Sequence, residues 1–255
     1  MEKKMFFNEI KNRINTLGDF VLFVFNVFYE TLSLKFRFSL FLQYMNLIGA
    51  QSLSIIIFTG FFTGAVFGLQ IGSVFMVFRA EGLMGGATGI ALATELAPLI
   101  TGFLLAGRVG SATTAEIATM VVNEQVEAIE AMGVSPIHYL VTPRVFASAI
   151  VMPLLCGVFM FIGVIGSYMA GIYIYSIDEG VFFENLVYLA QSKDIIVGLR
   201  KMFFFSFIIS LLSCFFGLKA SGGAKGVGLA TTDSVVKILI YILISDFVIS
   251  YIEVH

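Results

Sequence analysis

Charged residues are scarce in this chain. Only 13% of its 255 residues are Asp, Glu, Lys or Arg, whereas about one quarter of a typical soluble domain is charged. Hydrophobic residues make up 58% of the sequence and fall in long runs. Runs of this length and density exclude an ordinary soluble protein and indicate a polytopic membrane protein.

Tryptophan is absent and cysteine is nearly so. Tyr and Phe must therefore supply any aromatic belt at the membrane surface. Cys156 and Cys214 both lie in apolar runs, so a structural disulfide is not expected and the compartment cannot be read from them.

Motifs for catalysis and nucleotide binding are missing as well. The sequence has no G-x-x-x-x-G-K-[ST] run, and the glycine-rich stretch at 221–228 has no Ser or Thr after Lys225, so it is predicted to be a flexible loop. His138 and His255 stand alone, without a cluster of metal-ligand spacing. Nothing resembles a nucleophile with its base. We expect no metal, no cofactor, no nucleic-acid partner and no enzymatic activity in this chain itself.

The first 38 residues combine cations with apolar residues and lack the compact apolar core and cleavage site of a signal peptide. The cations are Lys3, Lys4, Lys11, Arg13, Lys35 and Arg37. This pattern predicts an amphipathic helix over residues 1–38 that lies on an anionic membrane surface. A disordered basic leader is the alternative for its first part.

The rest of the chain, residues 39–255, is predicted to be one all-α membrane domain with five spans. They cover about 44–78, 88–121, 140–174, 196–217 and 233–252. Several exceed the roughly 20 residues that cross a bilayer, so we expect them to tilt, kink or protrude.

Lys and Arg near the span ends indicate the orientation. The N-terminal segment is rich in them, and further cations flank the loops 122–143 and 218–232. The 175–195 loop is acidic, although Lys193, Arg200 and Lys201 weaken the asymmetry. The N-terminus is therefore predicted to be cytoplasmic and the C-terminus to lie outside.

Glycines recur at intervals of four in the first span, at Gly60, Gly64, Gly68 and Gly72. This spacing places them on one helical ridge, where a neighbouring backbone can approach closely. Packing within one subunit and a dimer seam are equally compatible with the ridge. A second ridge of Gly102, Ala106 and Gly110 lies in the second span, and we expect the two ridges to be able to pack together.

Three ionisable residues lie at similar depth in the predicted outer half of the membrane. They are Glu95 in the second span, Lys201 in the fourth and Asp246 in the fifth. Ionisable groups inside a membrane need partners or water. They predict either a polar patch in a substrate cavity or an ion pair that locks helices together.

Arg108 and Glu116 lie toward the cytoplasmic end of the second span. They are eight residues apart, so they fall on nearby helical faces. We interpret them as mainly structural, paired with neighbouring helices or with lipid headgroups.

A short amphipathic helix is predicted in the cytoplasmic loop, about 123–133. Glu124, Glu127 and Glu130 form one face by helical spacing, and Val126, Ile129 and Met132 form the opposite one. Gly133 and Pro136 then stop the helix. Because anionic lipid repels carboxylates, this face favours a protein partner, with a merely solvated face as the alternative.

Residues 94–147, TELAPLITGFLLAGRVGSATTAEIATMVVNEQVEAIEAMGVSPIHYLVTPRVFA, resemble the signature core of MlaE-type permeases. These are the membrane subunits of lipid ABC transporters that work with MCE-domain proteins. FTGAVFGLQIG at 62–72 and SDFVIS at 245–250 are similar to the same family, and EAIEAMG at 127–133 is similar to the coupling motif of ABC permeases. The resemblance covers about residues 40–252.

The resemblance implies an assembly in the bacterial inner membrane. It implies a homodimer with cytoplasmic ATPase subunits below, periplasmic MCE-domain proteins above and a small STAS-type accessory subunit. Phospholipids would move between the inner membrane and the outer envelope, and only the partner ATPase would bind and hydrolyse ATP. Residues 1–38 would hold the membrane anchor of the MCE protein.

The resemblance also implies roles for single residues. Glu95, Lys201 and Asp246 match polar positions of an outward-facing lipid cavity, and Leu69 and Met76 match its apolar wall. Glu124, Glu127, Glu130, Met132 and Gly133 would form the coupling helix that enters the ATPase groove. One departure stands out: Thr94 precedes the cavity Glu where the family often has Arg, so headgroup contacts are expected to differ.

Two other functions stay open from the sequence. An ion-coupled secondary transporter would use Glu95 and Asp246 as proton carriers, but it would be expected to show an inverted repeat, which is not visible. A membrane scaffold without transport is the third.

Overall fold

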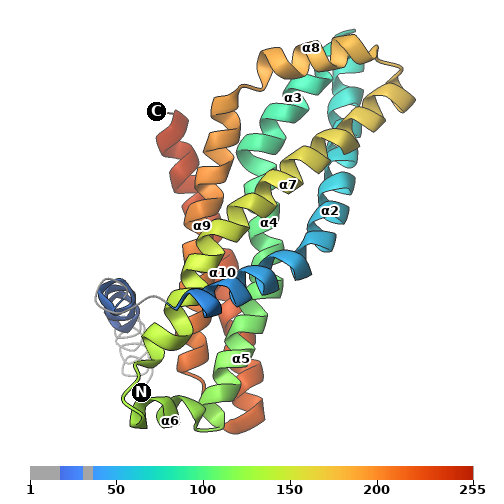
Figure 1. The fold of residues 1–255 in the computed structure, drawn as a ribbon. Helices are drawn as coiled ribbons and strands as arrows, with labels where there is room; N and C mark the ends of the chain where they lie inside the picture. The colour runs from blue at the N-terminus through green and yellow to red at the C-terminus, as the bar shows by residue number, and fades with distance from the viewer. Residues whose placement is uncertain (1–17, 31–36, 255) are drawn as a thin grey trace, which may run out of the picture.

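Long α-helices make up the described part of the chain, which comprises residues 18–30 and 37–254 (Figure 1). That part of this computed structural model contains no strand, so the predicted all-α class is confirmed. Residues 18–30, within the predicted interfacial segment, form one helix. Residues 1–17 and 31–36 lie outside the described residues. Of the six cations of the segment, only Arg37 is among the described residues.

Five described stretches are long and apolar enough to cross a membrane, as predicted. They are Phe38–Val77, Glu81–Val122, Ile137–Tyr175, Ser192–Leu218 and Gly223–Glu253. The first is helix α2 (Phe38–Val77), and the second contains α3 (Met84–Ala91), α4 (Ala97–Leu105) and α5 (Ser111–Val122). The others are formed by α7 (Thr142–Tyr175), α9 (Ser192–Leu218) and α10 (Gly223–Val254). Two short helices, α6 (Gln125–Ala131) and α8 (Glu179–Leu189), lie at opposite ends of the molecule (Figure 1).

The prediction of a flexible loop at 221–228 is wrong, because α10 begins at Gly223. Gly222 and Gly223 make the preceding turn, with φ angles of +91° and +68°. Each glycine inside a helix costs about 1 kcal/mol of helix propensity. Cooperative extension from the apolar part of α10 outweighs this cost. A hydrogen bond from the Thr114 hydroxyl of α5 to the Ser234 hydroxyl, at 3.0 Å, also holds the first half of α10 in place.

The glycine ridge of α2 packs against α7 within the same chain. A Cβ atom added at Gly64 would lie 1.9 Å from the carbonyl oxygen of Gly163, a distance that no real contact allows. In return, Gly166 of α7 lies directly on the backbone of α2 at Phe61. The two helices therefore meet through backbone contact from Gly60 to Gly68, and the ridge is used inside the subunit.

The second small-residue ridge does not meet the first. Gly102 lies against Phe205 and Ile242, and Gly110 lies against Ile209 and Ile238, so this ridge packs on α9 and α10. Sequence spacing identifies the face of a helix that accepts close neighbours, but it does not identify the neighbour.

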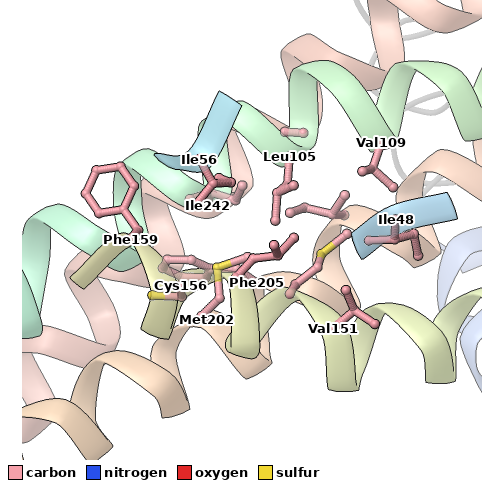
Figure 2. Packing of buried hydrophobic residues seen from close by; sticks show 14 of the residues in the cluster. Ile48, Ile56, Leu105, Val109, Val151, Cys156, Phe159, Met202, Phe205 and Ile242 are labelled. Carbon is pink, nitrogen blue, oxygen red and sulfur yellow. The ribbon is translucent and has the colours of Figure 1, made fainter. Parts of the chain in front are cut away.

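The main hydrophobic core lies where five of the helices cross. Figure 2 shows side chains from α2, α4, α7, α9 and α10 converging there, among them Ile56, Leu105, Cys156, Phe205 and Ile242. All five of these side chains are fully buried. This core sits midway along the bundle and separates the polar groups near the α8 end from those near the α6 end.

Candidate functional site

The second span is interrupted by two π-helical turns, Leu92–Leu96 and Ala106–Gly110. Each contains one ionisable residue, Glu95 in the first and Arg108 in the second. Pro98 explains the first turn, because proline has no amide hydrogen to bond the carbonyl of Thr94 in the α-helical pattern. A π turn inserts one residue and redirects the side chains around it, and such turns are frequent at functional sites.

Gly198 brings α9 against the first π turn. A Cβ atom at this position would lie 2.0 Å from the carbonyl oxygen of Ala93, so only glycine fits. This contact places the next turn of α9, which carries Lys201, beside Glu95. The close approach of the two backbones therefore builds the polar site.

The ammonium group of Lys201 is surrounded by oxygen atoms from two other helices. Its Nζ lies 2.7 Å from Glu95 Oε1 and 3.3 Å from Asp246 Oδ1, and it donates a hydrogen bond of 2.8 Å to the Ser250 hydroxyl. Ser250 in turn donates to Glu95 Oε1 at 3.1 Å. Asp246 and Ser250 are four residues apart on α10, so they share one helical face. Three spans thus meet at one ion cluster.

The members of this cluster differ sharply in exposure. The Lys201 side chain is 0% exposed and that of Asp246 is 15% exposed, whereas 47% of the Glu95 side chain is exposed. Two carboxylates face a single ammonium group, which leaves the cluster with excess negative charge when both are ionised. The group that a ligand can reach is therefore the Glu95 carboxylate, while Lys201 holds it in place from behind.

An open apolar groove of about 380 Å³ is lined in part by Leu96, the residue that follows Glu95 in the chain. Leu96, the neighbour of Glu95, forms one side of it, and residues of α2 form the other. The α2 residues are Phe62, Thr63, Val66, Phe67 and Gln70. A groove of this kind next to an exposed carboxylate has the chemistry to hold an amphiphile, with its chain in the groove and its polar head at Glu95.

The two residues that the resemblance assigned to the apolar wall lie elsewhere on α2. Leu69 is half-buried against the cluster of Met84 and Phe182, and its carbonyl oxygen accepts a hydrogen bond of 2.6 Å from the Tyr175 hydroxyl. Met76 is 50% exposed, near the end of α2. In this structure the groove beside Glu95 is lined by neither of them.

The predicted amphipathic helix in the loop is α6, and its acidic residues are free of the bundle. Glu124 precedes it in the left-handed conformation, and Gly133 ends it with φ of +74°. Glu124, Glu127 and Glu130 are exposed. On the opposite face Val126 and Ile129 are half-buried, but Met132 is 72% exposed. The tip of the molecule thus presents carboxylates and one apolar side chain.

An ion pair between a buried arginine and a half-exposed glutamate joins the two helices on either side of α6. Arg144 at the start of α7 is 3% exposed, and its Nη2 lies 2.9 Å from Glu116 Oε1 on α5. The structural interpretation of Glu116 matches this geometry. Arg108 is half-buried, and no ion pair of it is found among the described residues.

A model of the family described as permease MlaE matches residues 41–252, which is most of the chain. The chain belongs to the MlaE permease family. A probable ABC transporter permease protein of Synechocystis sp. is 40% identical over 82% of this chain and 80% of its own length. One of Rickettsia felis is 40% identical over 92% and 91%, and one of Pyropia yezoensis is 34% identical over 95% and 92%.

This MlaE-family chain is therefore a multi-pass ABC transporter permease subunit, which is a transport role. The assignment favours ATP-driven transport over the ion-coupled alternative. Two residues that build its polar site, Ser250 and Gly198, were not assigned a role from the sequence. Ser250 follows Asp246 at a spacing of four, and that spacing was the available signal.

Proposed function

We propose that this permease moves phospholipids between the bacterial inner membrane and the outer envelope. In this proposal it acts as a homodimer with a cytoplasmic ATPase, a periplasmic MCE-domain protein and a small STAS-type accessory subunit. The α6 end faces the cytoplasm and the α8 end faces the periplasm. The N-terminal segment, 1–38, lies on the membrane surface and contacts the anchor of the MCE protein.

The lipid part rests on the exposed Glu95 carboxylate, whose neighbour in the chain, Leu96, lines an apolar groove. Glu95 is half exposed, Lys201 is buried behind it, and Leu96 leads into the groove along Val66 and Gln70. A phospholipid needs an apolar surface for its chains and polar groups at its head. With both carboxylates ionised, the excess negative charge favours a headgroup that carries an amine, because opposite charges attract strongly where water is scarce.

The ATPase part rests on the exposed carboxylates of α6. Glu127 and Glu130 project from the end of the bundle, with Met132 exposed beside them. An apolar side chain within a ring of charges is a common centre for a protein contact. Closure of the ATPase dimer would push on α6 and, through α5 and α7, narrow the lipid groove. The ATP itself is bound by the partner.

The first experiment is purification of the tagged chain from its native membrane in a gentle detergent, followed by mass spectrometry of proteins and lipids. The proposal expects an ABC ATPase, an MCE-domain protein and bound phospholipid. A homo-oligomer without an ATPase or lipid would contradict it.

A pair of matched variants then tests the site. Glu95→Gln should reduce the bound phospholipid and its transfer to acceptor vesicles. Glu184→Gln, which alters an exposed carboxylate on α8, should leave both unchanged. Equal lipid loss in both variants, or in neither, would count against Glu95 as the headgroup contact.

A further inference from the structure

A second cavity, with both polar and apolar side chains in its wall, lies near the α6 end, on the other side of the core. It is enclosed by α2, α5, α7 and α9, has a volume of about 140 Å³ and shares no lining residue with the groove beside Glu95. A single buried water needs roughly 10–15 Å³, so this cavity has room for a larger polar group. Leu47, Gln51 and Ala112 are exposed members of its lining, so it reaches the surface between α2 and α5.

Arg144 lines the buried part of this cavity and has one donor, Nε, without a partner in the described part of the chain. Its Nη1 donates to the carbonyl oxygen of Leu140 at 2.7 Å, and its guanidinium lies 4.4 Å from the centre of the Tyr44 ring. Nη2 lies 2.9 Å from Glu116 Oε1 in an ion pair, whereas the buried Nε makes no hydrogen bond among the described residues. A buried donor of a cation is costly to leave unpaired, so an acceptor that reached Nε from the cavity would stabilise Arg144.

Glu116 determines what kind of acceptor can enter. Half of its side chain is exposed, and it lines the same cavity as Arg144. A simple anion would be attracted by Arg144 and repelled by Glu116. A group that carries both a phosphate and an amine satisfies both charges.

The hydroxyl groups in the wall favour the same occupant. Ser148 and Ser210 already donate their hydroxyl hydrogens to the carbonyl oxygens of Arg144 and Ser206, at 2.8 and 2.7 Å. Their oxygen atoms remain as acceptors, which suits the three donors of an ammonium group. The apolar rim at Leu47 suits the beginning of an acyl chain.

We propose that this cavity is a second headgroup site, which takes a zwitterionic phospholipid from the leaflet at the α6 end. The phosphate pairs with Arg144, and the amine pairs with Glu116. This inference rests on the proposed function, since it adds a second site for the same class of substrate. A headgroup there competes for the ion pair that joins α5 to α7, so its binding loosens the two helices that flank α6.

The test uses photoreactive lipids in nanodiscs that hold the full-length permease. Phosphatidylethanolamine carries a diazirine on the acyl carbon next to the glycerol, and a matched phosphatidylglycerol probe lacks the amine. Adducts are mapped by mass spectrometry and normalised to those on Phe247, which is 73% exposed on α10. The ethanolamine probe should label the segments that contain Gln51 and Ala112 more strongly than the glycerol probe.

Glu116→Gln should reduce this labelling about tenfold, as expected for the loss of one charge-assisted hydrogen bond. Glu253→Gln serves as the matched control and should leave it unchanged. Equal labelling by the two probes, or labelling that Glu116→Gln does not alter, would overturn the second site. Protection by free phosphoethanolamine without any lipid adduct would assign the cavity to a soluble ligand and would also overturn it.

The same samples separate this inference from the proposed function. Adducts at Val66 and Leu96 without adducts at Gln51 and Ala112 would reject the second site and leave phospholipid transport standing. An absence of specific adducts at both places would count against phospholipid as the substrate.

Discussion

Lys201 and Glu95 form an ion pair of 2.7 Å in which one partner is fully buried and the other is half exposed. This difference in exposure gives the two residues different roles in the site. The buried ammonium neutralises carboxylates that would otherwise be isolated in the membrane, and the exposed carboxylate is the group available to a ligand. The two residues should therefore respond differently to substitution.

Lys201→Met should destabilise the protein strongly, because it leaves the largely buried Asp246 without its cation. Breaking a buried pair from one side costs about 3–5 kcal/mol, most of it from the uncompensated charge. The measurement is the thermal stability of the purified protein in detergent. The double variant Lys201→Met/Asp246→Asn removes the Asp246 charge together with the Lys201 cation, so stability should recover in part. A double variant that is as unstable as the sum of the two single ones would show that the residues do not interact.

Gly198→Ala should disrupt the same site without removing any of its charges. The added methyl group meets the Ala93 carbonyl at 2.0 Å, so α9 must move away from the π turn and carry Lys201 with it. Overpacking of this kind costs about 1–3 kcal/mol. Stability and phospholipid co-purification are the two readouts, and both should fall.

Gly157→Ala in α7 is the matched control, since its new methyl group meets nothing closer than 3.9 Å. It should be neutral or stabilising by up to about 1 kcal/mol, through higher helix propensity. If the two variants behaved alike, the close approach at Gly198 would have no special role.

The sequence predicted the spans well and their contacts poorly, and the reason is physical. Hydropathy gives the number of spans, because each must be long and apolar enough to cross a bilayer. The spacing of Gly60 to Gly72 gives a helix face, but α7 was identified as its partner only by the structure. The start of α10 at Gly223 was missed, because tertiary contacts such as that of Thr114 with Ser234 override the low helix propensity of glycine.

The polar site shows the same limit. Glu95, Lys201 and Asp246 stood out because charges are rare within apolar runs, and their similar depth was readable from the span positions. The role of Gly198 could not be predicted from the sequence, because it depends on how closely the backbone at Ala93 approaches α9. Leu69 was assigned to the cavity wall through the resemblance, whereas the structure packs it beside Met84 and Phe182.

Tyr175→Phe should loosen the end of the α2–α7 pair near α8. The Tyr175 hydroxyl donates to the carbonyl oxygen of Leu69 at 2.6 Å, and its ring covers Gly72. Removal of the hydroxyl deletes one hydrogen bond, worth about 1 kcal/mol, while the ring still covers the glycine. Amide hydrogen exchange should become faster in α2 after Leu69 and stay unchanged near Gly60. Unaltered exchange along the whole helix would show that the ring alone holds the pair together.

Charge reversal on α6 should uncouple the permease from its ATPase and leave the fold intact. Glu127 and Glu130 are exposed and make no ion pair with other described residues, so Glu127→Lys/Glu130→Lys should change stability by less than about 0.5 kcal/mol. The same variant places cations where a partner surface complementary to carboxylates would meet them, and such like-charge contacts cost several kcal/mol. Substrate-stimulated ATP hydrolysis in the reconstituted complex should therefore fall to its basal rate.

Glu184→Lys on α8 is the control, because it reverses an exposed carboxylate at the opposite end of the molecule. Normal stimulation of ATP hydrolysis in the α6 variant would show that the acidic face is merely solvated and that the ATPase contacts another surface.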